Sequence, residues 1–351
     1  MKKVKKITVL LLAVILIVIA GCSSGKPPKE ALTAAMAKNA EADSYKMQMT
    51  LSLDELVIPQ NAAVQAEAAA AAAMAGMLKG ASVKIDAVYK KDPMRTDMNV
   101  EVVVPGDMEM KLTVPMIMTQ DLLYVKIPQI PMLALPETAT GKYIKIDLKE
   151  LAAQQGGLEI DMAEQQKLGK ELGEALLKHF DEKTYFSEPK AKDAGLPEDL
   201  KADQIVAVEV NESNYAQTVD TVVDKVLPEI IDILLNNEAY LKSLQLQKAD
   251  IEKFKSELEA NKAEVLNVLK NDVKVNQLKL TGAIKDGYLV YQAGQVNIEA
   301  KDKATGQQVK LGLHFNANLT DIDKEVTFEE LPADAMTLDE LTKMFELPAA
   351  L

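Results

Sequence analysis

Apolar and polar side chains alternate strictly over several stretches of the chain. The first run has apolar side chains at every second position, namely Tyr45, Met47, Met49, Leu51 and Leu53. A period of two is typical of a β-strand that buries one face. The same alternation returns at 98–104 and 309–319. We expect the three runs to belong to one antiparallel sheet.

Shorter alternating runs fill the segment 82–148 and are separated by turn residues such as Asp92-Pro93 and Pro105-Gly106. Proline and glycine supply the backbone geometry that tight turns need. The segment therefore reads as an antiparallel meander. A second block of alternating runs lies at 273–328 and includes a closing strand at 326–328.

Between and before these blocks the apolar period changes to that of a helix. The spacing predicts helices over 28–42 and 159–180. In 213–271 two apolar stripes lie opposite charged residues, and Pro228 interrupts the first. This predicts a helical hairpin laid on an apolar surface. The Ala-rich stretch 62–79 also favours a helix.

The order of strands, helices and strands indicates an α+β fold. We predict a large curved antiparallel sheet, a half-barrel, with helices packed on its concave apolar face. A long helical hairpin at 213–271 is an insertion into it, and the Ala-rich segment 62–79 is a second insert. One domain is expected to cover 30–347.

The first residues have the layout of a leader peptide. Four lysines precede an unbroken apolar stretch, Val9 to Ala20, which is too short to span a bilayer but suits a signal-peptide h-region. The chain's one cysteine, Cys22, follows directly behind Ile19-Ala20-Gly21. This tetrapeptide resembles the bacterial lipobox, which implies a signal peptide at 1–21, a diacylglyceryl group on Cys22 and a lipidated tether at 22–29. An ordinary signal peptide or N-terminal anchor with an incidental cysteine is the alternative.

Composition narrows the remaining chemistry. The formal net charge is −13, and aromatic residues make up only 4% of the chain. Nucleic-acid binding needs clustered Lys and Arg, so we expect no nucleic-acid partner. One Cys and two His nearly exclude a Cys/His metal site and any disulfide framework.

No catalytic signature appears in the sequence. Ser187 and Lys190 have the S-x-x-K spacing of Ser-Lys acyl enzymes, but Pro189 lies between them in a polar connection. His179 falls at a helix end and His314 on the polar side of a strand, so both read as surface residues. We therefore expect no enzymatic activity and no cofactor.

Methionine is abundant, at 16 residues, and several fall on one strand face. Unbranched, polarizable Met side chains adapt to varied acyl chains, and they equally fill the core between a sheet and helices. Cu(I) binding through M-x-M is a third reading, which lacks a neighbouring His or Cys.

Three stretches carry a resemblance to a known family. They are PPKEALTAAMAKNAEADSYKMQMTLSL, DLLYVKIP followed by GKYIKIDLKEL, and LTDIDKEVTFEELPADA. In these patterns the chain resembles the half-barrel lipoprotein superfamily, which includes the Lol lipoprotein carrier and the mycobacterial lipid-carrying lipoproteins. The resemblance implies a concave sheet that holds a lipid, with LTDIDKEVTFEELPADA as the last strand.

Together these features suggest a lipoprotein of the cell envelope, anchored through Cys22 to the outer face of the cytoplasmic membrane, or to the outer membrane if the cell has two. We expect it to bind or present an amphiphile, a lipid or a lipidated protein. The alternative is a structural or regulatory envelope protein that acts through protein contacts. The expected ligand-lining residues share one strand face: Met47, Met49, Val100, Val102, Met108, Met110, Leu311 and Leu313.

Overall fold

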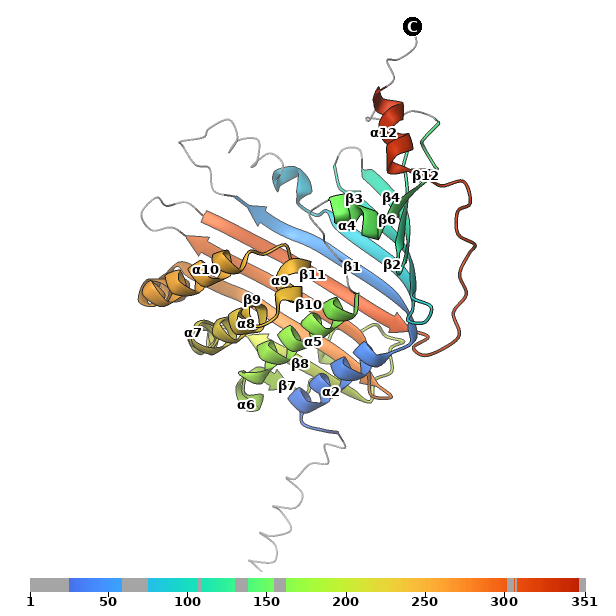
Figure 1. Ribbon diagram of the computed structural model, residues 1–351. Coiled ribbons are helices and arrows are strands. Elements are labelled where there is room, and N and C mark those ends of the chain that lie inside the picture. Colours follow the sequence, from blue (N-terminus) through green and yellow to red (C-terminus); the bar gives the residue numbers. More distant parts are fainter. Residues whose placement is uncertain are drawn as a thin grey trace, which may run out of the picture.

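The computed structural model describes residues 25–58, 75–106, 109–129, 138–154, 162–301, 306 and 308–346. Their strands form one 12-stranded sheet in the order β12-β6-β5-β4-β3-β2-β1-β11-β10-β9-β8-β7. The strands are β1 (Ser44–Val57), β2 (Ser82–Lys90), β3 (Arg95–Val104), β4 (Met110–Thr119), β5 (Leu122–Lys126), β6 (Tyr143–Asp147), β7 (Phe186–Ser187), β8 (Gln204–Val210), β9 (Val273–Lys285), β10 (Tyr288–Lys301), β11 (Gln308–Thr320) and β12 (Met336–Thr337). Figure 1 shows the sheet curling strongly at its β2–β6 side.

Most of the helices lie on the concave side of the sheet, in front of β7 to β11 (Figure 1). All helices and helical turns among the described residues are α2 (Pro28–Glu41), α4 (Leu148–Gln154), α5 (Met162–Lys178), α6 (Glu182–Tyr185), the 3₁₀ turn η2 (Ala191–Asp193), α7 (Tyr215–Thr221), the π-helical turn η3 (Val222–Val226), α8 (Leu227–Leu235), α9 (Glu238–Ser243), α10 (Lys248–Ala260), α11 (Lys262–Asp272) and α12 (Leu338–Glu346). None of the helices in the described part of the chain is both long enough and apolar enough to cross a bilayer.

The predicted α+β fold with one large curved sheet is confirmed. The runs 45–53, 98–104 and 309–319 lie in β1, β3 and β11 of the same sheet. The meander of 82–148 is β2 to β6 in consecutive order, and β1 joins it to the second block by pairing with both β2 and β11. Helix α5 lies within the predicted range 159–180.

Three details of the prediction are wrong. The sheet is not antiparallel throughout, since β12 pairs with β6 in parallel. The run 326–328 is not a strand but part of an extended segment, 321–335, that leaves β11 and leads to β12. The stretch 213–271 is not a simple hairpin: it holds five α-helices, and Pro228 stands at the second residue of α8, after a π turn. Helices α7 and α8 are continuous through this π turn, in which the Leu227 N–H bonds the Val222 carbonyl, and the wider turn accommodates a proline that has no N–H to donate.

The main apolar core lies where α2 packs on the sheet at β8, β9 and β10. Val206, Ile284 and Leu289 are almost fully buried there, at 1%, 6% and 3% exposure. Ala31 and Ala35 face them from α2, and their small side chains let the helix approach the strands closely. Smaller clusters join α5 to α8 and α9, and α12 to β6. One end of the concave face is therefore closed by α2.

Candidate functional site

The concave face of the sheet is a continuous apolar surface. Strand pairing places its side chains in ladders that cross many strands. One ladder runs through Leu280, Gly294, Phe315, Leu51, Val83, Val102 and Leu112. It crosses seven strands, from β9 to β4, and at about 4.8 Å between strands its path is about 29 Å long.

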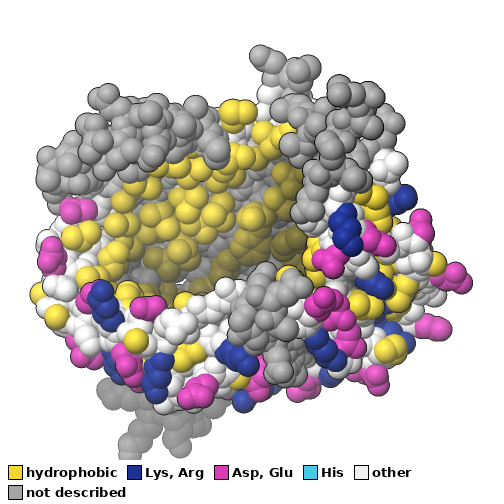
Figure 2. All heavy atoms as spheres, turned by 45° about the horizontal axis from the view of Figure 1, so that its top comes forward, with side chains coloured by type: hydrophobic (Ala, Val, Ile, Leu, Met, Phe, Trp, Pro, Cys, Tyr) yellow, Lys and Arg dark blue, Asp and Glu magenta, His cyan; other side chains and the backbone are white. Residues whose placement is uncertain are grey.

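Much of this surface is open to solvent. Leu51, Leu280, Val309 and Met110 are exposed at 40%, 41%, 41% and 49%. Figure 2 shows the corresponding hollow, lined with apolar side chains, with charged side chains below it and at its sides. Soluble proteins rarely leave an apolar patch of this extent uncovered unless it binds a ligand or a partner.

The two ends of the hollow differ. At the end where β8 begins, α2 covers Ile284 and Leu289. At the other end, Met110 begins β4 and Val309 lies at the start of β11, and both stay exposed. The view of Figure 2, with the top of Figure 1 turned forward, looks into the hollow from this open end.

Seven of the eight expected lining residues lie on this face. Their partners on the neighbouring strands are all apolar, and Ala317, Ala87 and Val104 are among them. The seven residues are Met47, Met49, Val100, Val102, Met110, Leu311 and Leu313. Met108 lies outside the described residues, as do Cys22 and most of the Ala-rich insert 62–79.

Several residues of the hollow were not among the candidates, notably Leu51, Leu280 and Phe315. All three share the alternation that selected the others, so parity alone would have found them. Alternation alone does not place Leu56 on this face. A β-bulge between Leu53 and Glu55 shifts the register, so that Leu56 pairs with Leu311.

Phe315 packs over Gly294, its neighbour in the ladder. A Cβ at Gly294 would lie 2.2 Å from Phe315 Cε1 and 2.9 Å from Leu280 Cδ2. The missing side chain therefore leaves the space that the Phe315 ring and the Leu280 side chain fill, and the apolar ladder stays continuous across β10.

Two tyrosine hydroxyls are polar groups of the concave face at the strand ends nearest α2. Tyr45 and Tyr89 pair across β1 and β2, with ring centroids 4.9 Å apart. Burial, together with the neighbouring Tyr89, raises the pKa of Tyr45, so its hydroxyl stays a proton donor near neutral pH. Within the described part of the chain neither hydroxyl makes a hydrogen bond.

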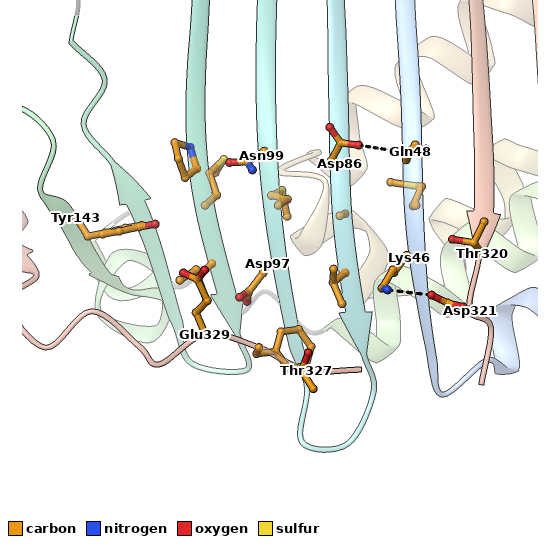
Figure 3. Close-up of a pocket in the computed structure, with 18 residues that line it drawn as sticks. Lys46, Gln48, Asp86, Asp97, Asn99, Tyr143, Thr320, Asp321, Thr327 and Glu329 are labelled. Carbon is orange, nitrogen blue, oxygen red and sulfur yellow. Dashed lines mark hydrogen bonds and ion pairs between the residues drawn. The ribbon is translucent and has the colours of Figure 1, made fainter. Parts of the chain in front are cut away.

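The convex face carries a separate, polar cavity of about 570 Å³ between the sheet and the segment 321–335. Figure 3 shows Lys46 paired with Asp321, at 2.9 Å, and Gln48 donating to Asp86, at 3.0 Å. Burial, and then the carboxylates of Glu329 and Asp97, raise the pKa of Tyr143. No group of three or more potential metal-binding side chains occurs among the described residues.

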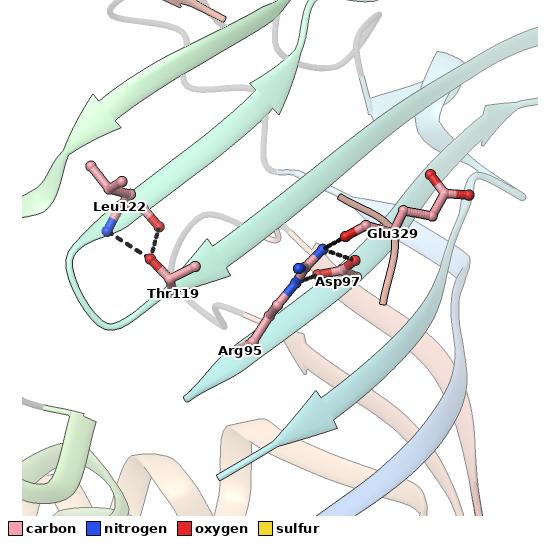
Figure 4. Close-up of polar contacts among 5 residues, drawn as sticks. All are labelled: Arg95, Asp97, Thr119, Leu122 and Glu329. Carbon is pink, nitrogen blue, oxygen red and sulfur yellow. Dashed lines mark hydrogen bonds and ion pairs between the residues drawn. The ribbon is translucent and has the colours of Figure 1, made fainter. Parts of the chain in front are cut away.

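Arg95 holds the segment 321–335 on this face. Its guanidinium forms a two-point ion pair with Asp97, at 2.7 and 2.8 Å, and donates to the Glu329 carbonyl at 2.7 Å (Figure 4). The same group lies 4.7 Å from the centre of the Phe328 ring. These contacts give the charged groups of the cavity a structural role.

Acid should weaken the contacts at the beginning of the segment 321–335. Hydrogen bonds from the Tyr288 hydroxyl and the Asp43 backbone N–H hold the pKa of Asp323 below its usual range, and Lys46 and Lys324 do the same for Asp321. A carboxyl with a lowered folded-state pKa contributes stability above its unfolded pKa of about 3.9 and loses it as pH falls through the folded pKa.

We therefore expect urea unfolding to show a loss of stability between about pH 5 and pH 3, and Asp323→Asn to make that loss smaller. Asn tolerates the positive φ of 54° at this position. The control Asp334→Asn changes an exposed carboxyl of the same segment and should leave the acid profile as it is. An unchanged profile in Asp323→Asn would assign the acid sensitivity to other groups.

The two histidines lie away from the hollow. His314 Nδ1 contacts Asp54 at 2.8 Å on the convex face, as expected for a surface residue. His179 Nε2 contacts Glu229 Oε2 at 2.5 Å and joins the end of α5 to α8. Ser187 lies in β7, outside any helix, so the S-x-x-K spacing has none of the helical context that acyl enzymes need.

Comparisons with known proteins give no family. No family model and no curated protein matches the chain. A solved structure of lipovitellin, described in terms of its lipid–protein interactions, has 8% identity over 83% of this chain and 26% of its own, with a TM-score of 0.22. The chain thus spans about a quarter of that protein. The dehydratase domain from the terminal module of the rifamycin polyketide synthase has 11% identity over 83% and 81%, with a TM-score of 0.10. At these TM-scores neither likeness carries an argument about this chain.

Proposed function

We propose that the protein binds an amphiphile, either a lipid or the lipid moiety of a lipidated protein, in the concave hollow. The observation that carries this proposal is the apolar ladder from Leu280 to Leu112, which stays partly exposed in the middle of the sheet. If the concave face served only as a hydrophobic core, helices would cover all of it, as α2 covers one end.

The size and chemistry of the hollow suit an acyl chain. About twelve CH₂ groups, buried along a path of about 29 Å, gain on the order of 10 kcal/mol before the costs of association. Met47, Met49 and Met110 contribute flexible side chains to this surface. The hydroxyls of Tyr45 and Tyr89 offer donors to a ligand oxygen such as an ester carbonyl, which supports an amphiphile over a plain hydrocarbon.

The proposal includes the anchor and the place of action. Ile19-Ala20-Gly21-Cys22 supports acylation of Cys22 after removal of 1–21, and so a position in the cell envelope on the outer face of the cytoplasmic membrane, or on the outer membrane where a second one exists. The large curved sheet with an apolar concave face supports the resemblance to half-barrel lipid carriers. No enzymatic step or cofactor is part of this function.

Mass spectrometry tests both the anchor at Cys22 and the bound amphiphile. Peptides from the membrane fraction should include an acylated one that begins at Cys22. Native spectra of residues 23–351, which contain every described residue, should show a co-purified lipid. A wild-type domain that carries no lipid and takes up no fluorescent fatty acid would contradict the carrier function, and a role through protein contacts would replace it.

A further inference from the structure

The start of the described chain is fixed at the closed end of the hollow. The Lys26 carbonyl accepts a hydrogen bond from Gln204 Nε2 at 2.8 Å, and Gln204 pairs with Ile284 near the end of β9. Lys29 Nζ donates to the Phe180 carbonyl at 2.7 Å. The first turn of α2 therefore cannot swing toward the open end without breaking these contacts.

The open end lies far from this point. Val309 pairs with Ala300, and Ala300 with Val273, so these residues mark the level at which β9 begins. Ile284 lies eleven residue steps after Val273 in β9, which corresponds to about 36 Å along the strand. Cys22 precedes Gly25 by three residues, and such a link reaches at most about 11 Å.

From this geometry we propose that the hollow exchanges its ligand with a lipid surface other than the membrane that holds Cys22. The inference rests on the proposed function. A lipid group on Cys22 brings the closed end next to the anchoring membrane and directs the open end away from it. The protein then loads or unloads in trans, across the space between two lipid surfaces.

The side chains at the open end favour a lipid surface as the partner. Ile58, Met77, Met110 and Val309 are exposed there at 37%, 69%, 49% and 41%. Isolated apolar side chains around an opening gain free energy by entering the acyl boundary of a bilayer, and their flexible Met members need no shaped partner.

Exchanging the tethered end of the protein tests the inference directly. Residues 23–351 carry a hexahistidine tag either before Ser23 or after Leu351 and bind to phosphatidylcholine vesicles that contain a nickel-chelating lipid. Helix α12 lies at the opposite end of the molecule from the start of α2 (Figure 1), so the C-terminal tag brings the open end to the membrane. A fluorescent phospholipid is placed either in the tethering vesicles (cis) or in separate vesicles (trans).

The N-terminally tethered protein should take up the probe from trans vesicles at least about fivefold faster than from cis vesicles. The reason is that the open end of its hollow points away from the vesicle that holds the tag. The C-terminal tag should reverse that preference. A flexible Gly/Ser insert of 60 residues before Gly25, with a mean span of about 43 Å, should restore cis uptake, whereas the same insert after Leu351 should not.

The outcomes separate the two proposals. If untethered protein takes up the probe and the N-terminally tethered protein uses cis and trans vesicles equally, this inference is overturned and the carrier function stands. If untethered protein takes up nothing from vesicles but accepts lipid from a protein donor, the partner is a protein and the lipid surface is refuted. If it takes up lipid from neither source, both proposals fail.

Discussion

Replacement of Leu51 by Glu is expected to abolish lipid uptake while the protein stays folded. Leu51 lies in the middle strand of the apolar ladder, between Phe315 and Val83, and is 40% exposed. Water reaches a carboxylate there in the empty protein, so folding loses little. A bound acyl chain would displace that water, and an unpaired charge against it costs about 3 kcal/mol or more, which is about a hundredfold in affinity.

The neighbouring position supplies a matched control. Thr50 points to the convex face and pairs with Lys84 and Asn316, so Thr50→Glu adds the same charge one residue away without entering the hollow. Fluorescent fatty-acid titration should show wild-type affinity for Thr50→Glu and almost none for Leu51→Glu. Equal affinities in the two variants would place the ligand elsewhere on the molecule.

The sequence was sufficient to predict the sheet because alternation depends only on local side-chain order. Met47, Met49 and Leu313 fall on one face since β1 and β11 pair in register from Lys46 to Leu53, and Leu311 follows Leu313 on the same face of β11. Where a bulge interrupts the register, as in β10 between Leu289 and Tyr291, strict parity fails and two apolar residues face opposite sides.

Which part of the concave face is covered by helices could not be predicted from the sequence, because it depends on where helices distant in sequence pack. Leu289 and Leu51 look alike in the sequence, yet α2 buries the first and leaves the second half open. The parallel β12 was equally beyond local reasoning, since its two residues, Met336 and Thr337, are too few to show a period.

The same pair of leucines tests whether the hollow is open or a filled core. Leu289 is 3% exposed, and its Cδ1 lies 2.7 Å from the place that a Cβ on Gly282 would take. Asn39 of α2 fixes its backbone with two hydrogen bonds, at 2.9 and 3.0 Å, so the surroundings cannot readily collapse into a void. Leu289→Ala should therefore lower the free energy of unfolding by about 2–5 kcal/mol.

Leu51→Ala removes the same atoms from a side chain that is 40% exposed and leaves no closed cavity, so it should cost about 1 kcal/mol. Urea unfolding with an unchanged m-value measures both losses on one scale. Two equally large losses would mean that Leu51 belongs to a packed core, in which an acyl chain has no place to lie. A large loss for Leu289 alone means that the protein maintains its fold at the α2 end and leaves the middle of the sheet free to hold a ligand.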